Sequence, residues 1–226
     1  MNGATTTVDL RTYLVTDSAL SGDRGVLAVI AGAVAGGVGV VQIREKNAPT
    51  RDVFDLVLRA AQITAGRAAL VVDDRVDVFL AARAAGAAVH GVHVGQSDLP
   101  VAAVRDLVGT HNPDGTRALV GLTANTPAHL DAVAAHPPGT VDYLGVGVIR
   151  ATATKPDHPA PLGVDGFAAL AATAPAPCVA IGGIDLPDIP ALRAAGAAGA
   201  AVVSAICAAP DPESATRGFA TAWGRS

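Results

Sequence analysis

Lysine is rare in this chain and occurs at two places where other polar and charged residues gather. Only two of the 16 cationic side chains are lysines: Lys46 in the segment QIREK and Lys155 in the segment TATKP. A lysine ammonium is a compact charge on a flexible stem, whereas an arginine guanidinium is a rigid fork. Together with Arg44, the two lysines could hold a diphosphate group while it departs from a substrate.

Two aspartates, Asp74 and Asp98, follow consecutive apolar runs of the sequence. Mg²⁺ prefers one or two carboxylates together with phosphate oxygens of a substrate, so this pair is a candidate metal site. Helix capping is the alternative: Asp73 and Asp74 precede an expected helix, and Asp98, with Pro100 two residues later, is a suitable helix start. Taken alone, Asp98 fits capping better, but the cations expected nearby favour the metal site.

A glycine pair and a serine form a third group. Gly182 and Gly183 follow one apolar run, and Val203 and Ser204 lie at the end of the last. Glycine lets backbone N–H groups approach phosphate oxygens, and the loops after the last two strands of an α/β barrel often bind phosphate. The alternative is that the glycines only make a tight turn. Because both halves of such a site are present, the sequence predicts a phosphate site here.

These groups are positioned by short apolar runs that recur along the chain. Eight runs are present: TYLVTD, VVQIRE, LVVDD, GVHVGQ, LVGLT, YLGVGV, CVAIGG and AVVSA. Between them lie alanine-rich segments with helical spacing: 23–36, 50–66, 75–86, 98–108, 126–134, 163–173, 186–196 and 211–222. Strands that helices cover on both faces are continuously apolar, so this alternation indicates a parallel sheet.

Eight strand–helix units in 226 residues predict an α/β fold, a (β/α)₈ TIM barrel, as a single domain over residues 1–226. A doubly wound open sheet is the alternative, but the expected G-x-G-x-x-G after the first strand is missing. In a TIM barrel the functional residues lie at the carboxyl ends of the strands. The residues at those positions are Gln42, Arg44, Glu45, Lys46, Asp73, Asp74, Gln96, Asp98, Thr123, Asn125, Thr152, Thr154, Lys155, Gly182, Gly183, Val203 and Ser204.

Composition excludes several classes of function. A net charge of −4 and an aromatic content of 3% do not suit nucleic-acid binding. Cys178 and Cys207 lack a zinc spacing, and His93 in GVHVGQ is expected to have its ring satisfied within a strand. The apolar segment 25–43 is long enough to span a membrane, but its central glycines favour a helix followed by a strand. Without an evident signal peptide, we expect a cytoplasmic protein with small-molecule partners.

The motifs YLVTD, VVQIREK, DDRVDV, GVHVGQSDLP, TATKPD, AIGGI and AVVSAI occur in this order. Together they resemble the thiamine-phosphate synthase family over about residues 12–207. The resemblance implies a barrel that joins an aminopyrimidine-methyl diphosphate to a thiazole ethyl phosphate, possibly in carboxylated form. Pyrophosphate would leave, thiamine monophosphate would form, and Mg²⁺ would be required. The oligomeric state stays open, with a homo-oligomer among the options.

The resemblance also implies roles for individual residues. The pyrimidine diphosphate would contact Gln42, Arg44, Lys46 and Lys155, of which the three cations are the catalytic candidates. The metal would be held by Asp74 and Asp98. The thiazole phosphate would contact Thr152, Thr154, Gly183, Val203 and Ser204. This chain departs from the family pattern at three places. Asp73 stands where the family usually has Asn, Thr123 replaces a usual Ser, and the loop before Thr152 loses two prolines and gains Arg150.

The implied chemistry is a dissociative substitution, in which the carbon–oxygen bond breaks before the thiazole nitrogen attacks. The protein would then stabilise charge on the departing pyrophosphate and hold the nucleophile close. Three alternatives remain open. A related thiazole tautomerase would not need both carboxylates and the R-E-K cations, and a Schiff-base aldolase using Lys155 would need a desolvated lysine. A non-catalytic phosphate-binding relative is the third.

Overall fold

The computed structural model describes residues 8–152 and 160–224, and its eight strands close into a barrel. Each strand pairs in parallel with the next along the chain, and β8 pairs with β1, so the sheet has no free edge. The strands are β1 (Thr12–Val15), β2 (Val40–Ile43), β3 (Ala69–Asp73), β4 (Gly91–Val94), β5 (Leu119–Thr123), β6 (Tyr143–Gly147), β7 (Cys178–Ile181) and β8 (Gly199–Val202). Every expected apolar run overlaps one of these strands, which confirms the TIM barrel and rules out the open sheet.

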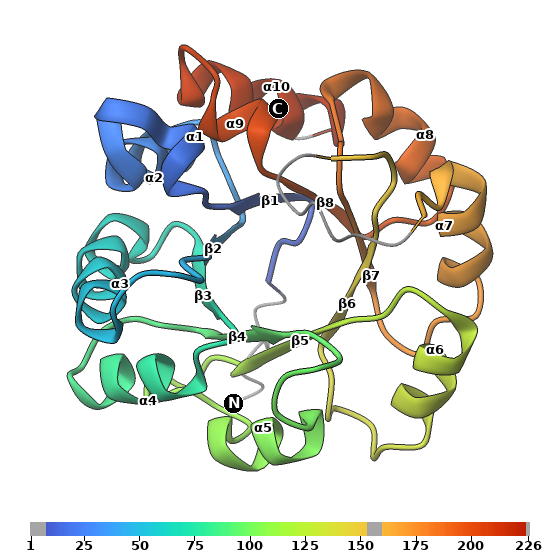
Figure 1. Ribbon diagram of the computed structural model, residues 1–226, viewed down its shortest axis with the longest axis horizontal. Helices are drawn as coiled ribbons and strands as arrows, with labels where there is room; N and C mark the ends of the chain where they lie inside the picture. The colour runs from blue at the N-terminus through green and yellow to red at the C-terminus, as the bar shows by residue number, and fades with distance from the viewer. Residues whose placement is uncertain (1–7, 153–159, 225–226) are drawn as a thin grey trace, which may run out of the picture.

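Helices form an outer ring around the barrel (Figure 1). They are α1 (Ser18–Ser21), η1 (Gly22–Arg24), α2 (Gly25–Ala35), α3 (Thr50–Thr64), α4 (Val76–Ala84), α5 (Val101–Val108), α6 (Pro127–Ala134), α7 (Gly163–Ala171), η2 (Leu186–Asp188), α8 (Ile189–Ala194), α9 (Ser204–Cys207) and α10 (Pro212–Ala222). The large apolar core lies between this ring and the outer face of the strands. A smaller core, with Tyr13, Val71 and Tyr143 among its members, fills the barrel itself.

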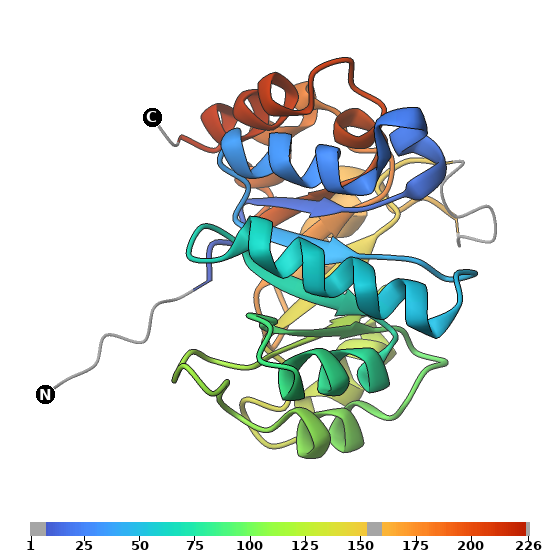
Figure 2. The same ribbon diagram turned by 90° about the vertical axis from the view of Figure 1, so that its left-hand side faces the viewer.

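Side chains alternate between these two cores along each strand, as the pleat requires. On β3, Leu70 and Val72 belong to the outer core and Val71 to the inner one. The inward positions change from apolar to polar toward the carboxyl ends of the strands, where Asp73 and Thr123 end β3 and β5. Viewed from the side, all strands run in the same direction, and the loops that follow them gather at one end (Figure 2).

The helix expected at 98–108 begins three residues later than the sequence predicts, at Val101. The residue before a proline is held out of helical conformation, so Pro100 prevents Leu99 from joining a helix. Pro100 itself is extended, with φ −52° and ψ 131°. Asp98 is therefore not an N-cap, and the capping alternative for this residue is wrong. Elsewhere the expected helix 186–196 divides into η2 and α8, and the sequence did not predict the short helices α1 and α9.

One helical segment in the described part of the chain, Ser18–Ala35, is long and apolar enough by composition to cross a membrane. It contains α1, η1 and α2, and α2 packs beside α3 and α10. Val29, Ile30 and Ala33 are fully buried in the core. The apolar segment thus serves as a packed helix of the outer ring, followed by Gly36 and Gly37 and then by strand β2, as the glycine pattern predicted.

The amino-terminal end of the barrel carries a buried ion cluster. Arg105 on α5, only 8% exposed, donates to the carboxylate of Asp142 and to the carbonyl oxygens of Gly109 and Ala118. Asp142 also accepts a bond from Arg117 Nε at 2.8 Å. Because each charge has partners, the cluster ties α5 to the loops before β5 and β6 at the end opposite the candidate site.

Candidate active site

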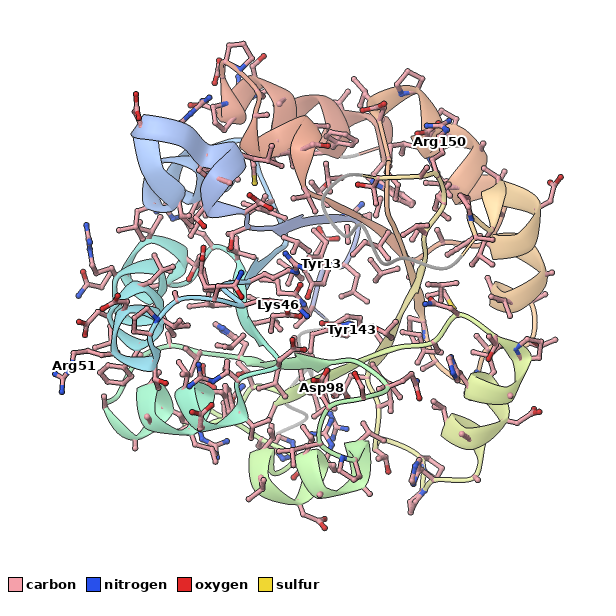
Figure 3. All side chains as sticks on the ribbon, in the orientation of Figure 1. Tyr13, Lys46, Arg51, Asp98, Tyr143 and Arg150 are labelled. Atoms are coloured by element: carbon pink, nitrogen blue, oxygen red, sulfur yellow. The ribbon has the colours of Figure 1, made fainter. Side chains whose placement is uncertain are left out.

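A cavity of about 510 Å³ opens at the carboxyl ends of the strands. Of the site residues expected from the sequence, the cavity is lined by Gln42, Arg44, Lys46, Asp73, Asp74, Asp98, Thr123, Thr152, Gly183, Val203 and Ser204. Figure 3 shows Lys46 at the middle of the barrel mouth and Asp98 nearby, whereas Arg51 lies outside on α3. Thr154 and Lys155 lie outside the described residues. Gln96, Asn125 and Gly182 line the cavity as well, whereas Glu45 does not. The strand-end rule therefore brings fourteen of its residues, from seven strands or their loops, to one cavity.

Two ion pairs join the end of β2 to the end of β3. Lys46 Nζ lies 3.0 Å from Asp74 Oδ2, and Arg44 Nε lies 3.8 Å from Asp73 Oδ2. Burial alone would lower the pKa of Lys46, but the hydrogen bond and negative charge of Asp74, with the charge of Asp73, outweigh it and raise that pKa. Lys46 is therefore a permanently charged ammonium at neutral pH, suited to binding an anion and unsuited to acting as a free amine.

Asp73 has an unusual charge state for an aspartate. Burial of its side chain, followed by the negative charge of Asp74, raises its pKa to about 7. Lys46 and Arg44 oppose this increase but do not cancel it. The family's usual Asn would be uncharged at this position. With a pKa of about 7, Asp73 is partly protonated near neutral pH, and its protonated form is likewise uncharged.

Asp74 adopts a left-handed backbone conformation, with φ +58°. This region is unfavourable for most side chains, but aspartate, asparagine and glycine enter it more readily. The backbone N–H of Asp74 donates to the carbonyl of His93 at 2.8 Å, which extends the β3–β4 pairing by one residue. The next N–H, of Arg75, turns back to Asp73 O at 2.6 Å. This turn lets the Asp74 carboxylate line the cavity before α4 begins.

Asp98 is oriented by its own loop. Its Oδ2 accepts the backbone N–H of Gly95 at 2.7 Å, and a Cβ added at Gly95 would lie 2.9 Å from that oxygen. Only a residue without a side chain fits at position 95 without displacing the carboxylate. Asp74 and Asp98 thus line one cavity from adjacent strand ends, on the same side of the fold as Lys46.

The donor set fits a magnesium ion that substrate completes. Among the described residues, no three His, Cys, Asp or Glu side chains are grouped closely enough to hold a metal ion by themselves. Asp74 and Asp98 provide hard oxygen donors, and Mg²⁺ is usually held by one or two carboxylates plus substrate phosphate oxygens. The two aspartates therefore suit Mg²⁺ bound together with a phosphorylated substrate and do not form a closed protein site.

The glycine turn after β7 lies across the cavity from these charges. Gly182 and Gly183 have φ +95° and +62°, and a Cβ at Gly183 would lie 2.9 Å from Arg150 Cβ. The loop after β6 therefore packs directly against the turn, and Arg150 N donates to Gly182 O at 3.0 Å. The Arg150 guanidinium also makes a two-pronged ion pair with Asp188 in η2. This ion pair fixes the segment in which two family prolines are missing.

Three residues that the sequence did not assign to the site also belong to its floor. His93 lines the cavity, and its ring contacts Thr123 on one side and Tyr143 on the other. Burial of the ring lowers the pKa of His93 to about 4, so the imidazole is neutral at pH 7. Tyr143 contacts Tyr13, whose hydroxyl meets Gln42. The expectation that the His93 ring is satisfied locally is confirmed, and one of its partners, Thr123, lines the cavity. The pairing of His93 with Asp73 on the neighbouring strand was the signal that could have placed His93 at the site.

Known proteins resemble this chain over most of its length. A model of the family described as thiamine monophosphate synthase matches residues 12–206. The thiamine-phosphate synthase of Solidesulfovibrio magneticus is 48% identical over 206 residues, which cover 91% of each chain. That of Psychrobacter sp. (strain PRwf-1) is 40% identical over 206 residues, covering 91% of this chain and 92% of the relative.

Solved structures share the architecture. The thiamine phosphate pyrophosphorylase from Pyrococcus furiosus superposes with a TM-score of 0.78 at 27% identity, covering 95% of this chain and 96% of that one. A 3-hexulose-6-phosphate synthase superposes with a TM-score of 0.66 at 18% identity, a likeness of fold alone. Because both the family model and the relatives span nearly all of the barrel and its mouth, the chain belongs to the thiamine monophosphate synthase family and is a transferase of thiamine biosynthesis.

Proposed function

We propose that this enzyme joins an aminopyrimidine-methyl diphosphate to a thiazole ethyl phosphate and releases pyrophosphate and thiamine monophosphate; from the carboxylated thiazole, CO₂ is released as well. One observation carries the proposal: a single cavity has cations and carboxylates from β2–β4 on one side and a glycine turn after β7 on the other. Two phosphorylated substrates of different charge need two such regions. A single monophosphate would need only the second.

The diphosphate is assigned to the side with the higher charge. Arg44 and Lys46 would contact its oxygens, and Asp74 and Asp98 would hold Mg²⁺, which would supply further positive charge beside the pyrophosphate group. When a diphosphate binds, Lys46 can exchange its contact with Asp74 for one with a phosphate oxygen, because its stem is flexible. Lys155 is a further cationic candidate of this group, by the family resemblance.

The thiazole phosphate is assigned to the turn after β7 and the segment after β8. Backbone N–H groups at Gly183 and the hydroxyl of Ser204 are suited to phosphate oxygens, and Val203 lies beside them in the cavity lining. Thr152 lines the same cavity, and Thr154 is expected to act with it. Arg150 would support this side indirectly, because its contact with Gly183 O at 3.3 Å holds the turn.

The reaction requires the protein to position the two substrates and to stabilise the charge of the leaving group. It requires no nucleophilic side chain. The bond between the pyrimidine methylene carbon and oxygen breaks with its electron pair going to pyrophosphate, and the lone pair of the thiazole nitrogen then forms the new carbon–nitrogen bond. Electron donation from the aminopyrimidine stabilises the carbon between these steps. Gln42, Asp73 and Thr123, which line the cavity, would hold the ring while Arg44 and Lys46 would stabilise the leaving group.

We also assign the enzyme to the cytoplasm and treat residues 1–226 as one domain that acts on small molecules. Both cysteines, Cys178 and Cys207, are free and buried, which suits a reducing compartment.

A turnover experiment tests the function. The purified protein is incubated with both substrates and Mg²⁺, and thiamine monophosphate and pyrophosphate are measured together, with EDTA as a control. We expect equal amounts of both products, lost with EDTA. Asp98→Asn and Asp74→Asn should lower turnover by about 10²–10³, whereas Asp131→Asn on the exposed face of α6 should not. Isomerisation of the carboxylated thiazole without pyrophosphate release would instead identify a tautomerase.

A further inference from the structure

A continuous set of hydrogen bonds crosses the floor of the cavity. Gln42 Nε2 lies 3.1 Å from the hydroxyl of Tyr13, which lies 2.7 Å from the hydroxyl of Tyr143. That hydroxyl lies 3.2 Å from His93 Nδ1, and His93 Nε2 lies 3.1 Å from Thr123 Oγ1. We call these five residues, from β1, β2, β4, β5 and β6, the floor chain. Tyr13 and Tyr143 lie at the middle of the barrel (Figure 3).

The barrel makes room for the floor chain with glycine. A Cβ at Gly121 would lie 2.2 Å from Tyr143 Cζ and 2.5 Å from His93 Nδ1, which no side chain could occupy. The rings of His93 and Tyr143 stack at 5.6 Å between centroids. Tyr13 and Tyr143 are 2% and 1% exposed, so water cannot replace a lost partner at either hydroxyl without rearrangement.

The direction of every hydrogen bond follows from the first one. The amide nitrogen of Gln42 can only donate, so the Tyr13 hydroxyl accepts from it. Among the described residues the other partner of this buried hydroxyl is the Tyr143 oxygen, so the Tyr13 proton goes to Tyr143. Tyr143 then donates to His93 Nδ1, because each hydroxyl has one proton. A neutral imidazole with an accepting Nδ1 carries its proton on Nε2, so His93 donates to Thr123. The Thr123 proton is thereby left to point elsewhere.

The two residues at the ends of the floor chain line the cavity, one as a hydrogen-bond acceptor and the other as a donor. At Gln42 the amide nitrogen is used, so the amide oxygen is the group that accepts from a ligand. At Thr123 the oxygen already accepts from His93, so the hydroxyl donates to a ligand. An aminopyrimidine offers the complementary pair: an amino group that donates and a ring nitrogen that accepts.

We propose that the floor chain fixes this acceptor-and-donor pattern and so selects the amino-substituted ring, with Tyr13, Tyr143 and His93 as positioning residues that act through Gln42 and Thr123. The inference rests on the proposed function for the identity of the ligand. It goes beyond that function because it assigns a role to three interior residues. Reversing the chain would present a donor at Gln42 and only an acceptor at Thr123, which does not match the ring.

A double-mutant cycle tests the kinetic consequence. Tyr143→Phe keeps the ring and removes the proton that holds the His93 tautomer, so KM for the pyrimidine diphosphate should rise about tenfold, the effect of one lost hydrogen bond. KM for the thiazole phosphate should stay within twofold of its original value. In a Thr123→Val background, which has no hydroxyl to orient, only the contribution through Tyr13 and Gln42 remains, so the Tyr143→Phe effect should be clearly smaller than in a Thr123→Ser background.

Equal effects of Tyr143→Phe in the Val and Ser backgrounds would overturn the proposal. A purely structural effect would raise KM by the same factor whichever residue stands at position 123. A rise in both KM values would also overturn it. The direction of the chain is tested separately by ¹⁵N NMR of the histidines in protein without substrates. His93 should show an unprotonated Nδ1 and a protonated Nε2, and Tyr143→Phe should allow the other tautomer. A protonated Nδ1 in the unsubstituted protein would refute the direction. This measurement does not depend on turnover, so it distinguishes failure of the floor chain from failure of the proposed function.

Discussion

Asp73→Asn is expected to make the protein more stable at pH 8 than the unsubstituted protein, with a much smaller gain at pH 5. The side chain of Asp73 is 9% exposed and its pKa is about 7 in the folded protein, against the ordinary 3.8 that an unfolded chain would show. Between these two values the folded state binds a proton that the unfolded state has released. Stability therefore falls as pH rises from about 4 to about 7 and is constant above that range.

The size of the effect follows from the pH range. Each pH unit within the range changes the free energy of unfolding by about 1.4 kcal/mol for one proton, so the step from pH 5 to pH 7 is worth roughly 2.5 kcal/mol. Asparagine cannot ionise, so this loss should be absent in the variant. Asparagine also keeps the shape of the side chain and is the residue that the family pattern has at this position.

Urea unfolding at pH 5 and pH 8, with EDTA in both buffers, measures the difference. The quantity compared is the change in free energy of unfolding between the two pH values, for the unsubstituted protein, Asp73→Asn and the exposed control Asp131→Asn. The control should behave like the unsubstituted protein. If Asp73→Asn shows the same pH dependence as the control, then Arg44 and Lys46 hold Asp73 ionised, and the assignment of a buried, protonated carboxyl is wrong.

Three further substitutions have defined outcomes. Gly121→Ala places a Cβ 2.2 Å from Tyr143 Cζ and should lower the free energy of unfolding, measured in urea, by about 1–3 kcal/mol. It should also raise KM for the pyrimidine substrate. An unchanged stability would show that the Tyr143 ring moves freely. Asp142→Asn leaves the buried Arg105 without its countercharge and should destabilise the fold by about 3–5 kcal/mol while kcat at 20 °C stays the same; a change in kcat would contradict the separation of the two ends of the barrel. Arg150→Ala removes the ion pair that holds the glycine turn and should raise KM for the thiazole phosphate several-fold but not KM for the diphosphate, as steady-state kinetics with each substrate varied would show.

The positions of the cavity residues could be predicted because a parallel barrel obeys a strict geometric rule. Once the eight apolar runs are identified, the residue that follows each strand must lie at the carboxyl-terminal mouth. Lys46 and Asp74, 28 positions apart in the sequence, therefore meet at 3.0 Å without any need to know the loops. The prediction that a helix starts at residue 98 was wrong for a local reason. Asp98 is a residue type that favours capping, but Pro100 keeps Leu99 out of the helical conformation.

The floor chain could not be predicted in the same way. Each of its members is an ordinary strand residue by type, and which hydroxyl meets which ring depends on the barrel's register. A tyrosine at 13 and another at 143 become neighbours only because β1 and β6 both send side chains inward at the same level. The spacing of residues in the sequence predicts where strands end, but it does not predict which inward side chains of distant strands lie at the same height in the barrel.

The left-handed conformation at Asp74 restricts which side chains could adapt the proposed Mg²⁺ site to another metal. A combinatorial library at position 74 favours aspartate, asparagine, histidine and glycine, since glutamate or cysteine there would combine a new ligand with an unfavourable backbone. Asp98 does not have a positive φ, so its backbone places no such restriction on the residue type. Selection for activity with a softer metal should therefore yield varied ligands at 98 but only histidine as a new ligand at 74.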